Sequence, residues 1–135
     1  MTAPGELPVR VYYEDTDAGG IVYHASYLRF AERGRTELLR ELGFDQRVLA
    51  RDHGVLFAVA RCELVFLRPA RLDDLLIVRT RAVAHGGARV EMAQRIECDG
   101  ALLVEIELVL AVLRAEDLRP TRLPEPLRLA FARLQ

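Results

Sequence analysis

The segment 13–27, which reads YEDTDAGGIVYHASY, holds the residues with the clearest capacity for chemistry. It brings three acids, Glu14, Asp15 and Asp17, close to His24 in the sequence. Carboxylates and imidazoles can activate a water molecule or attack an acyl carbon directly. The residue types therefore point to acyl-transfer or hydrolytic chemistry on this segment.

The backbone of the same segment also suits that chemistry. Gly19 and Gly20 make the loop pliable. A helix predicted to begin near His24 offers unpaired N–H groups and the positive end of the helix dipole, which stabilise a developing oxyanion. We expect acids, a base and exposed amides to converge there.

Simpler roles are also open, and spacing alone favours them for the aspartates. Asp15 and Asp17 are typical of loop solvation or helix capping. His24 can cap the helix. Tyr13 stands at the end of a predicted strand, where an aromatic ring more often packs than reacts. The residues by themselves predict a candidate site and no more.

Two elements position this loop. The first is a predicted strand from Leu7 to Tyr13, in which apolar and polar residues alternate as in a half-buried strand. The second is a helix from about His24 to Leu42, with Gly43 as a natural C-terminal stop. The apolar residues of this helix recur at helical spacing and form one stripe: Tyr27, Leu28, Ala31, Leu38, Leu39 and Leu42.

Gly34 falls inside that stripe, where it costs about 1 kcal/mol relative to alanine. A glycine at this position predicts close approach of the helix to a flat surface, such as a sheet.

Strand-like runs fill most of the remaining chain, after a polar connection over 45–54. Four runs follow one another: Val55 to Arg68, Leu75 to Ala84, Ala88 to Cys98 and Ala101 to Leu113. A short terminal helix is predicted over Glu125 to Leu134. The fold class is therefore α+β, with an antiparallel sheet of about five strands wrapped around one long helix.

The last hairpin can be built in two registers. A two-residue turn at Asp99-Gly100 sets Met92 opposite Glu107, so that an apolar side chain and a charged side chain would share one face of the sheet. A three-residue loop that begins at Cys98, with Gly100 left-handed, aligns the apolar residues instead. We expect this second register, which pairs Val90 with Leu108, Met92 with Ile106 and Ile96 with Leu102.

The sheet face away from the helix also carries apolar residues. Val109 and Leu113 alternate outward with Glu105 and Glu107. We expect another subunit to cover part of that face.

Composition limits the remaining possibilities. The 135 residues fit one domain, 1–135, and a formal net charge of −1 gives no electrostatic reason to bind nucleic acid. The longest apolar run, Leu108 to Leu113, is too short for a transmembrane segment, and residues 1–8 lack an export signal, so we expect a cytoplasmic protein. Cys62 and Cys98 have the spacing of neither a metal site nor a disulfide framework. We expect reduced, buried thiols and no metal or cofactor.

The run EDTDAGGIVYHASYLRFAERGRTELLRELG resembles the 4-hydroxybenzoyl-CoA thioesterase family of hotdog-fold proteins. It is most similar to the branch associated with the Tol-Pal system of Gram-negative bacteria. A later run, FLRPARLDDLL at 66–76, resembles the turn after the second strand in that branch, and the likeness covers nearly the whole chain. One departure is Gly34, where relatives usually carry alanine.

The resemblance implies roles for individual residues. The essential aspartate of the family stands in a D-x-x-G step, which here is Asp17 with Gly20. The backbone N–H groups of His24 and Tyr23 are expected to polarise the thioester carbonyl. Tyr13 and the His24 side chain are expected beside the carboxylate.

The resemblance also implies an acyl-CoA thioesterase that releases CoA and a free acid. Asp17, and not Asp15, would act as general base or as a nucleophile that forms a mixed anhydride. The expected assembly is a homodimer or homotetramer, and an acyl carrier protein is a further candidate partner. Two other functions stay open: a hotdog hydratase or dehydratase, against which the D-x-x-G loop argues, and a non-catalytic acyl-CoA or acyl-carrier-protein binding module.

Overall fold

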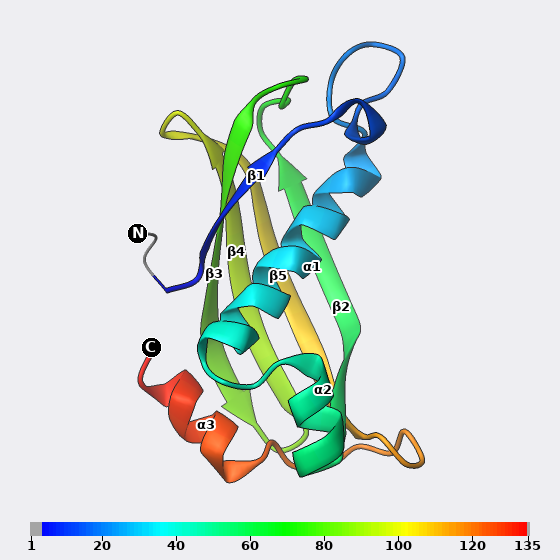
Figure 1. The fold of residues 1–135 in the computed structure, drawn as a ribbon, viewed down its shortest axis with the longest axis vertical. Helices are drawn as coiled ribbons and strands as arrows, with labels where there is room; N and C mark the ends of the chain where they lie inside the picture. Colours follow the sequence, from blue (N-terminus) through cyan, green and yellow to red (C-terminus); the bar gives the residue numbers. More distant parts are fainter. Residues whose placement is uncertain (1–3, 135) are drawn as a thin grey trace.

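The chain folds into one long helix and five strands, in an order close to the predicted one (Figure 1). The structure, a computed structural model, describes residues 4–134; residues 1–3, part of the segment searched for an export signal, lie outside the described residues. The elements are β1 (Glu6–Arg10), the 3₁₀ turn η1 (Tyr13–Asp15), α1 (His24–Glu41), α2 (Gln46–Val48), the π-helical turn η2 (Leu49–His53), β2 (Val55–Phe66), β3 (Leu75–Gly86), β4 (Arg89–Cys98), β5 (Ala101–Arg114) and α3 (Glu125–Ala132).

The five strands form one antiparallel sheet in the order β1-β3-β4-β5-β2. α1 lies across one face of this sheet, and α3 lies at the end of the sheet opposite the loop that leads into α1 (Figure 1). The largest fully buried side chains come from α1, the strands, η2 and α3, and they include Phe30, Met92, Leu49 and Phe131. The predicted α+β arrangement of about five antiparallel strands around one long helix is confirmed.

α1 forms where the apolar stripe predicted it and ends as expected. Gly43 follows the helix with a φ of +88°, a left-handed conformation that glycine adopts without strain. The prediction that Leu28 belongs to the buried stripe is wrong, because Leu28 is 46% exposed. Phe30, which was not included in the predicted stripe, is fully buried. Among residues 4–134, no helix combines the length and apolar character that a membrane span requires.

Gly34 lets α1 approach β3 closely, as its place in the stripe predicted. A Cβ atom here would lie 2.7 Å from Cγ1 of Val78 and 2.9 Å from Oγ1 of Thr80. Gln94 fills the same layer from β4, since its Nε2 donates to the Ala31 carbonyl and to Thr80 Oγ1, both at 2.8 Å. Packing against the sheet, and not an unusual backbone angle, is what requires glycine.

The structure corrects one predicted stretch and adds detail to another. β1 ends at Arg10 and not at Tyr13, because the chain leaves β3 and turns into η1. The connection over 45–54 was predicted only to be polar, and it contains two helical turns, α2 and η2. The Asp45 side chain starts α2 by accepting a hydrogen bond from the Val48 N–H at 2.9 Å. The predicted terminal helix is present as α3.

The hairpin between β4 and β5 has neither of the two simple registers. Asp99 and Gly100 form a two-residue turn with φ values of +50° and +79°, so the predicted three-residue loop is wrong. A β-bulge after Ile96 then shifts the pairing and sets Met92 opposite Leu108. The apolar face is preserved by an extra residue inside the strand, not by a longer turn.

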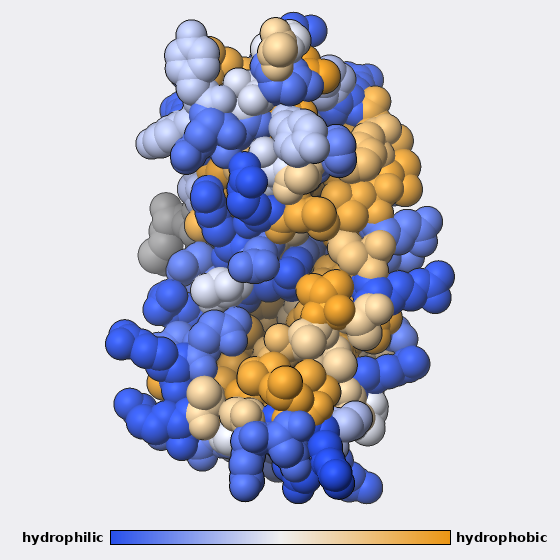
Figure 2. Space-filling view, turned by 90° about the vertical axis from the view of Figure 1, so that its right-hand side faces the viewer, coloured by the Kyte–Doolittle hydropathy of each residue, from blue (hydrophilic) through white to orange (hydrophobic). Residues whose placement is uncertain are grey.

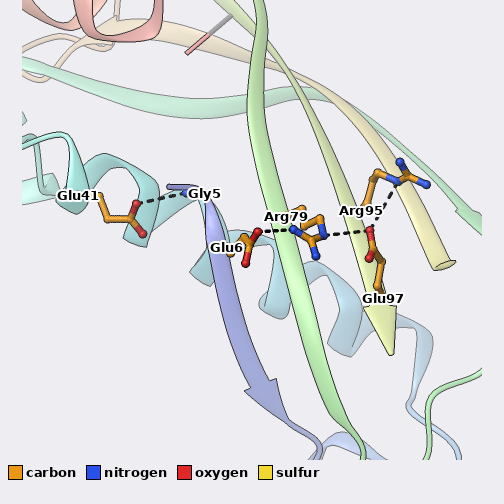
Figure 3. Close-up of polar contacts among 6 residues, drawn as sticks. All are labelled: Gly5, Glu6, Glu41, Arg79, Arg95 and Glu97. Carbon is orange, nitrogen blue, oxygen red and sulfur yellow. Dashed lines mark hydrogen bonds and ion pairs between the residues drawn. The ribbon is translucent and has the colours of Figure 1, made fainter. Parts of the chain in front are cut away.

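The N-terminal strand is tied to both α1 and the sheet (Figure 3). The Gly5 N–H donates to Glu41, the last residue of α1, at 3.2 Å. Glu6 forms an ion pair with Arg79 on β3, and Arg79 also donates to Glu97 on β4 at 3.1 Å. These contacts hold the start of β1 beside the C-terminal end of α1 and beside β3.

Candidate active site

The loop between η1 and α1 is a tight hairpin with Asp17 at its turn. The Asp17 N–H donates to the Ile21 carbonyl at 2.9 Å, and the Gly20 N–H donates to the Asp17 carbonyl at 3.1 Å. Gly20 has a φ of +83°, so the turn needs a residue that tolerates the left-handed region. The loop is closed by its own hydrogen bonds and holds Asp17 in a defined position.

The Asp17 carboxylate is exposed and only partly engaged. Its Oδ1 accepts a hydrogen bond from the Gly19 N–H at 2.8 Å, which fixes the direction of the side chain. Its Oδ2 forms no hydrogen bond or ion pair with any of residues 4–134. One oxygen is therefore oriented by the backbone, while the other is free to meet water or a ligand.

Asp17 lines a hollow of about 410 Å³ at the start of α1. His24 and Tyr27 reach it from α1, and residues 66–69 reach it from the end of β2. The rest of the wall is mainly apolar, and Arg68 adds a cation. The hollow joins the two stretches of sequence, near Asp17 and near residue 66, that carried the family resemblance.

The first residue of α1, His24, lines this hollow and has an unpaired backbone amide. The His24 N–H has no acceptor among residues 4–134, and it stands at the positive end of the 18-residue helix. The Tyr23 N–H, in contrast, donates to the Asp15 carbonyl at 2.9 Å. Of the two amides expected to polarise a carbonyl, only that of His24 is available in this structure.

Asp15 has a structural position that separates it from Asp17. Its side chain is buried, and Oδ2 accepts a hydrogen bond from the Tyr12 N–H at 2.8 Å. Its carbonyl oxygen also accepts from the Ser26 hydroxyl at 3.1 Å, inside the first turn of α1. Asp15 therefore fastens η1 to the helix start, whereas Asp17 faces the hollow.

The two remaining predicted side chains lie in different places. The His24 ring lines the hollow and packs against the Tyr23 ring, with centroids 4.4 Å apart. Tyr13 is 82% exposed and does not line the hollow of its own chain. Its expected place beside the carboxylate stays a prediction.

Tyr27 belongs to the hollow although the sequence identified it only as a core residue. Its ring is buried, and its hydroxyl oxygen accepts a hydrogen bond from the Ala70 N–H at 3.0 Å. Burial raises the pKa of this hydroxyl, and the hydrogen bond from Ala70 partly opposes that shift. The family resemblance implied a turn at residues 66–76, and the contact between Tyr27 and Ala70 brings that turn to the site.

The two thiols lie outside the hollow of Asp17. Cys62 and Cys98 are free thiols, and both are half-buried, so the prediction that they are buried is wrong. Burial raises the pKa of both thiols. Within residues 4–134, no group of three or more His, Cys, Asp or Glu side chains is arranged to hold a metal ion.

Known proteins are similar to this chain over nearly its full length. The sequence profile of the thioesterase-like superfamily matches residues 11–131. The acyl-CoA thioesterase YbgC of Haemophilus influenzae is 41% identical over 129 residues, which cover 96% of this chain and 95% of that protein. The acyl-CoA thioester hydrolase YbgC of Escherichia coli is 42% identical over 125 residues, which cover 92% of each chain.

A solved structure of a probable thioesterase has the same fold as this chain. A probable thioesterase from Bartonella henselae superposes on this chain with a TM-score of 0.83 at 42% sequence identity. The superposition covers 88% of this chain and 98% of the other.

Proposed function

The chain belongs to the thioesterase-like superfamily and is an acyl-CoA thioester hydrolase, and we propose that the Asp17 carboxylate and the His24 backbone N–H carry its chemistry. One observation carries this proposal: a half-free carboxylate and an unpaired helix-start amide come from adjacent elements at one hollow. The hollow is walled mainly by apolar side chains, which suits an acyl group.

The thioester carbonyl binds at the start of α1 in this proposal. The His24 N–H donates a hydrogen bond to the carbonyl oxygen, and the helix dipole adds to the stabilisation of negative charge there. Both effects grow as the carbonyl becomes a tetrahedral oxyanion. They therefore favour the transition state over the bound substrate.

Asp17 acts on the carbonyl carbon that this amide polarises. As a general base, its carboxylate takes a proton from water while the water oxygen attacks the carbon, and the C–S bond then breaks to release the CoA thiolate. As a nucleophile, the carboxylate attacks the carbon, expels the thiolate and leaves a mixed anhydride that water opens. Both routes end in CoA and a free acid, and both use Oδ2, the oxygen that Gly19 leaves free.

Hydrolysis of a panel of acyl-CoA thioesters tests this assignment and identifies the acyl group in the same experiment. The panel runs from short to long aliphatic chains and includes aromatic acyl groups. Asp17→Asn should lower kcat by about 10²- to 10⁴-fold on each substrate that the wild type hydrolyses, the range for loss of a general base. Glu14→Gln is the matched control, because Glu14 is an exposed acid of the same segment that does not line the hollow. Equal turnover by Asp17→Asn and the wild type would reject the assignment.

A single turnover in isotopically labelled water separates the two routes. Direct attack transfers labelled oxygen into the Asp17 carboxylate when water opens the anhydride at the aspartyl carbon. A general base leaves the carboxylate unlabelled, and so does water that opens the anhydride at the acyl carbon, so label in Asp17 is the result that establishes direct attack. Mass spectrometry of the peptide that contains Asp17 reads the difference.

The side chains of His24 and Tyr13 have supporting roles in the proposal. The His24 imidazole lines the hollow and can orient the attacking water or the carboxylate. The Tyr13 hydroxyl can donate to the carboxylate only after η1 moves or from a second copy of the chain, because Tyr13 lies outside the hollow of its own chain. His24→Ala and Tyr13→Phe should therefore lower kcat less than Asp17→Asn does.

We propose that the active unit is a homodimer joined along β2. β2 is one edge of the sheet, and an unpaired edge is a template for another strand. Figure 2 looks onto this side of the molecule, where apolar surface extends down the view between polar margins. Four apolar side chains on or just after β2 are 44% to 52% exposed: Val59, Val65, Phe66 and Leu67. A second copy at this edge would cover them and narrow the hollow beside residues 66–69.

The resemblance supports further expectations that stay predictions. They are the pairing of dimers into a homotetramer, a cytoplasmic location, an association with the Tol-Pal system and an acyl carrier protein as partner.

A further inference from the structure

α1 covers the sheet unevenly and leaves part of β2 open. The core-facing side chains of β5 are buried, among them Val104, Ile106 and Leu108. Their cross-strand partners lie on the same face but are more accessible, and they are Phe66, which is 52% exposed, and the half-buried Leu64 and Cys62. We call the accessible surface over these three residues of β2 the α1–β2 strip. Figure 2 looks onto this side of the molecule.

The α1–β2 strip begins at the hollow of Asp17. Phe66 lines that hollow, and its ring lies 5.7 Å from the ring of Tyr27, between centroids. Leu64 and Cys62 follow on the same face of β2, about 7 and 13 Å farther along the strand at 3.4 Å per residue. An acyl chain whose carbonyl lies at His24 can therefore leave the hollow past Phe66 and continue over apolar surface.

Arg35 brings a cation to this strip from α1. Its side chain is half-buried, and its Nη1 donates to Gln94 Oε1 on β4 at 3.1 Å. Gln94 shares one row of the sheet with Leu64, because both strands pair with β5 at Ile106. Burial lowers the pKa of the guanidinium, and the nearby Cys62 on β2 partly opposes that shift. Arg35 therefore lies on the β2 side of α1, at the level of Leu64 and Cys62.

Gln94 fixes the direction of the Arg35 side chain. Gln94 is 1% exposed, and its Nε2 donates to the Ala31 carbonyl and to Thr80 Oγ1, both at 2.8 Å. Both N–H groups of the amide are thereby used, and Oε1 is left as the acceptor for Arg35. A buried hydrogen-bond network thus holds the guanidinium in place.

The charge of Arg35 has no partner of opposite sign within residues 4–134. The hydrogen bond to Gln94 is the only one that its side chain forms there, and it forms no ion pair. Glu32, one turn earlier on α1, lies near enough to raise the pKa of Arg35 but does not reach ion-pair distance. Keeping a charge half out of water without a counter-charge costs free energy. The guanidinium has five N–H donors in a planar fork that matches a carboxylate, so an anion is the ligand that fits.

We propose that Arg35 selects acyl groups that end in a carboxylate, so that the substrate is the CoA thioester of a dicarboxylic acid. This inference rests on the proposed function. The thioester carbonyl lies at His24, the chain follows the α1–β2 strip, and the terminal carboxylate pairs with Arg35. Hydrolysis then releases CoA and the dicarboxylic acid. Arg35 touches only the far end of the acyl group, so it determines specificity and takes no part in the chemical step.

The positions of His24 and Arg35 set the length of the acyl group. The eleven residues between positions 24 and 35 correspond to about 16 Å of helix at 1.5 Å per residue. The Arg35 side chain leans toward the start of α1, which shortens the gap to roughly 10 to 16 Å. At about 1.2 Å per bond of an extended chain, roughly 8 to 13 carbons span this gap.

Matched pairs of acyl-CoA thioesters test the proposal on the wild type. The two members of a pair have the same number of carbons, and one ends in a carboxylate where the other ends in a methyl group. At the preferred length, the wild type should hydrolyse the carboxylate-ended member with at least about tenfold higher kcat/KM, as expected for a hydrogen-bonded ion pair. A wild type that hydrolyses the methyl-ended member equally well or better at every length overturns the proposal. This comparison needs no variant and so does not depend on whether a variant folds.

Arg35→Met tests the residue itself, because it removes the charge and keeps an apolar stem. The ratio of kcat/KM between the two members should fall at least about tenfold. Arg33→Met is the matched control, since Arg33 is an exposed arginine of the same helix that lines a different hollow beside β1. Its ratio should stay at the wild-type value. A folded Arg35→Met variant with the wild-type ratio overturns the proposal, and so does an equal fall in Arg33→Met.

Asp17→Asn separates this inference from the proposed function. That variant should slow hydrolysis of both members of each pair alike. If Arg35 has no part in specificity, the ratios fail to respond to Arg35→Met while hydrolysis still depends on Asp17. If the proposed function is wrong, hydrolysis of both members continues in Asp17→Asn.

Discussion

Replacing Gly34 by alanine should destabilise the protein, although alanine is the better helix former. Helix propensity alone favours the exchange by about 1 kcal/mol. The new Cβ, however, would lie 2.7 Å from Cγ1 of Val78 and 2.9 Å from Oγ1 of Thr80. Val78 is a fully buried β-branched side chain, and Thr80 is held by Gln94 at 2.8 Å, so neither atom moves away easily.

The magnitude follows from these two opposing effects. Overpacking of a buried site costs about 1 to 3 kcal/mol. After the gain in propensity, Gly34→Ala should lower the free energy of unfolding by about 1 kcal/mol, or Tm by roughly 3 to 5 °C for a chain of this size. Urea unfolding followed by circular dichroism measures the change. All variants are compared at one protein concentration, because association shifts apparent stability.

A double-mutant cycle identifies the clash as the cause. Val78→Ala removes the atom nearest to the new Cβ, so Gly34→Ala should cost about 1 kcal/mol less on that background than in the wild type. Val112→Ala is the matched control, since Val112 is also a fully buried strand valine but is not among the nearest contacts of position 34. Greater stability of Gly34→Ala, or an equal cost on all three backgrounds, would refute the reasoning.

Three further predictions concern the surroundings of the hollow. Asp15→Ala should lower the free energy of unfolding by about 1 to 3 kcal/mol, because a backbone N–H loses its acceptor, whereas Asp17→Asn should leave thermal unfolding nearly unchanged. Tyr27→Phe removes the acceptor of the Ala70 N–H and should cost a similar amount, measured by urea unfolding; wild-type stability would show that the hydrogen bond contributes nothing. Burial raises the pKa of the Cys62 thiol and of the Tyr27 hydroxyl, so the native chain keeps these protons at pH values where the unfolded chain loses them. The free energy of unfolding should therefore fall as pH rises above about 8.5, less steeply in Cys62→Ala, and a profile that stays flat to about pH 10 would contradict this.

Periodicity predicted most of the fold because burial follows the helical and strand repeats. The stripe on α1 also predicted where the helix meets the sheet, since Gly34 has no other reason to interrupt it. Leu28 and Phe30 show the limit of that signal, because the stripe does not define which residues at its margins are buried. The β4–β5 hairpin shows another limit. The alternation of apolar residues requires that apolar side chains of β4 and β5 lie on the same face of the sheet. An extra residue within a strand achieves this as well as an extra residue in the turn does, so the sequence pattern does not distinguish the two.

The sequence predicted the part of the site that is formed by the loop before α1, but not the part that is formed by tertiary contacts. The acids, the glycines and the helix start are adjacent in sequence, so the convergence of Asp17 and His24 could be foreseen. Two facts depend on tertiary contacts that spacing does not contain. One is the burial of Asp15 against the first turn of α1, which occupies the Tyr23 amide. The other is the position of residues 66–69, at the end of β2, which form much of the apolar wall of the hollow.

Single-turnover hydrolysis by Asp17→Asn, measured together with binding of a non-hydrolysable acyl-CoA thioether, tests most directly whether the Asp17 carboxylate carries the chemistry. We predict that the rate of hydrolysis falls by at least about 10²-fold while the dissociation constant of the thioether changes little, as expected for a group that acts in the transition state. Hydrolysis by Asp17→Asn at the wild-type rate would contradict the central claim.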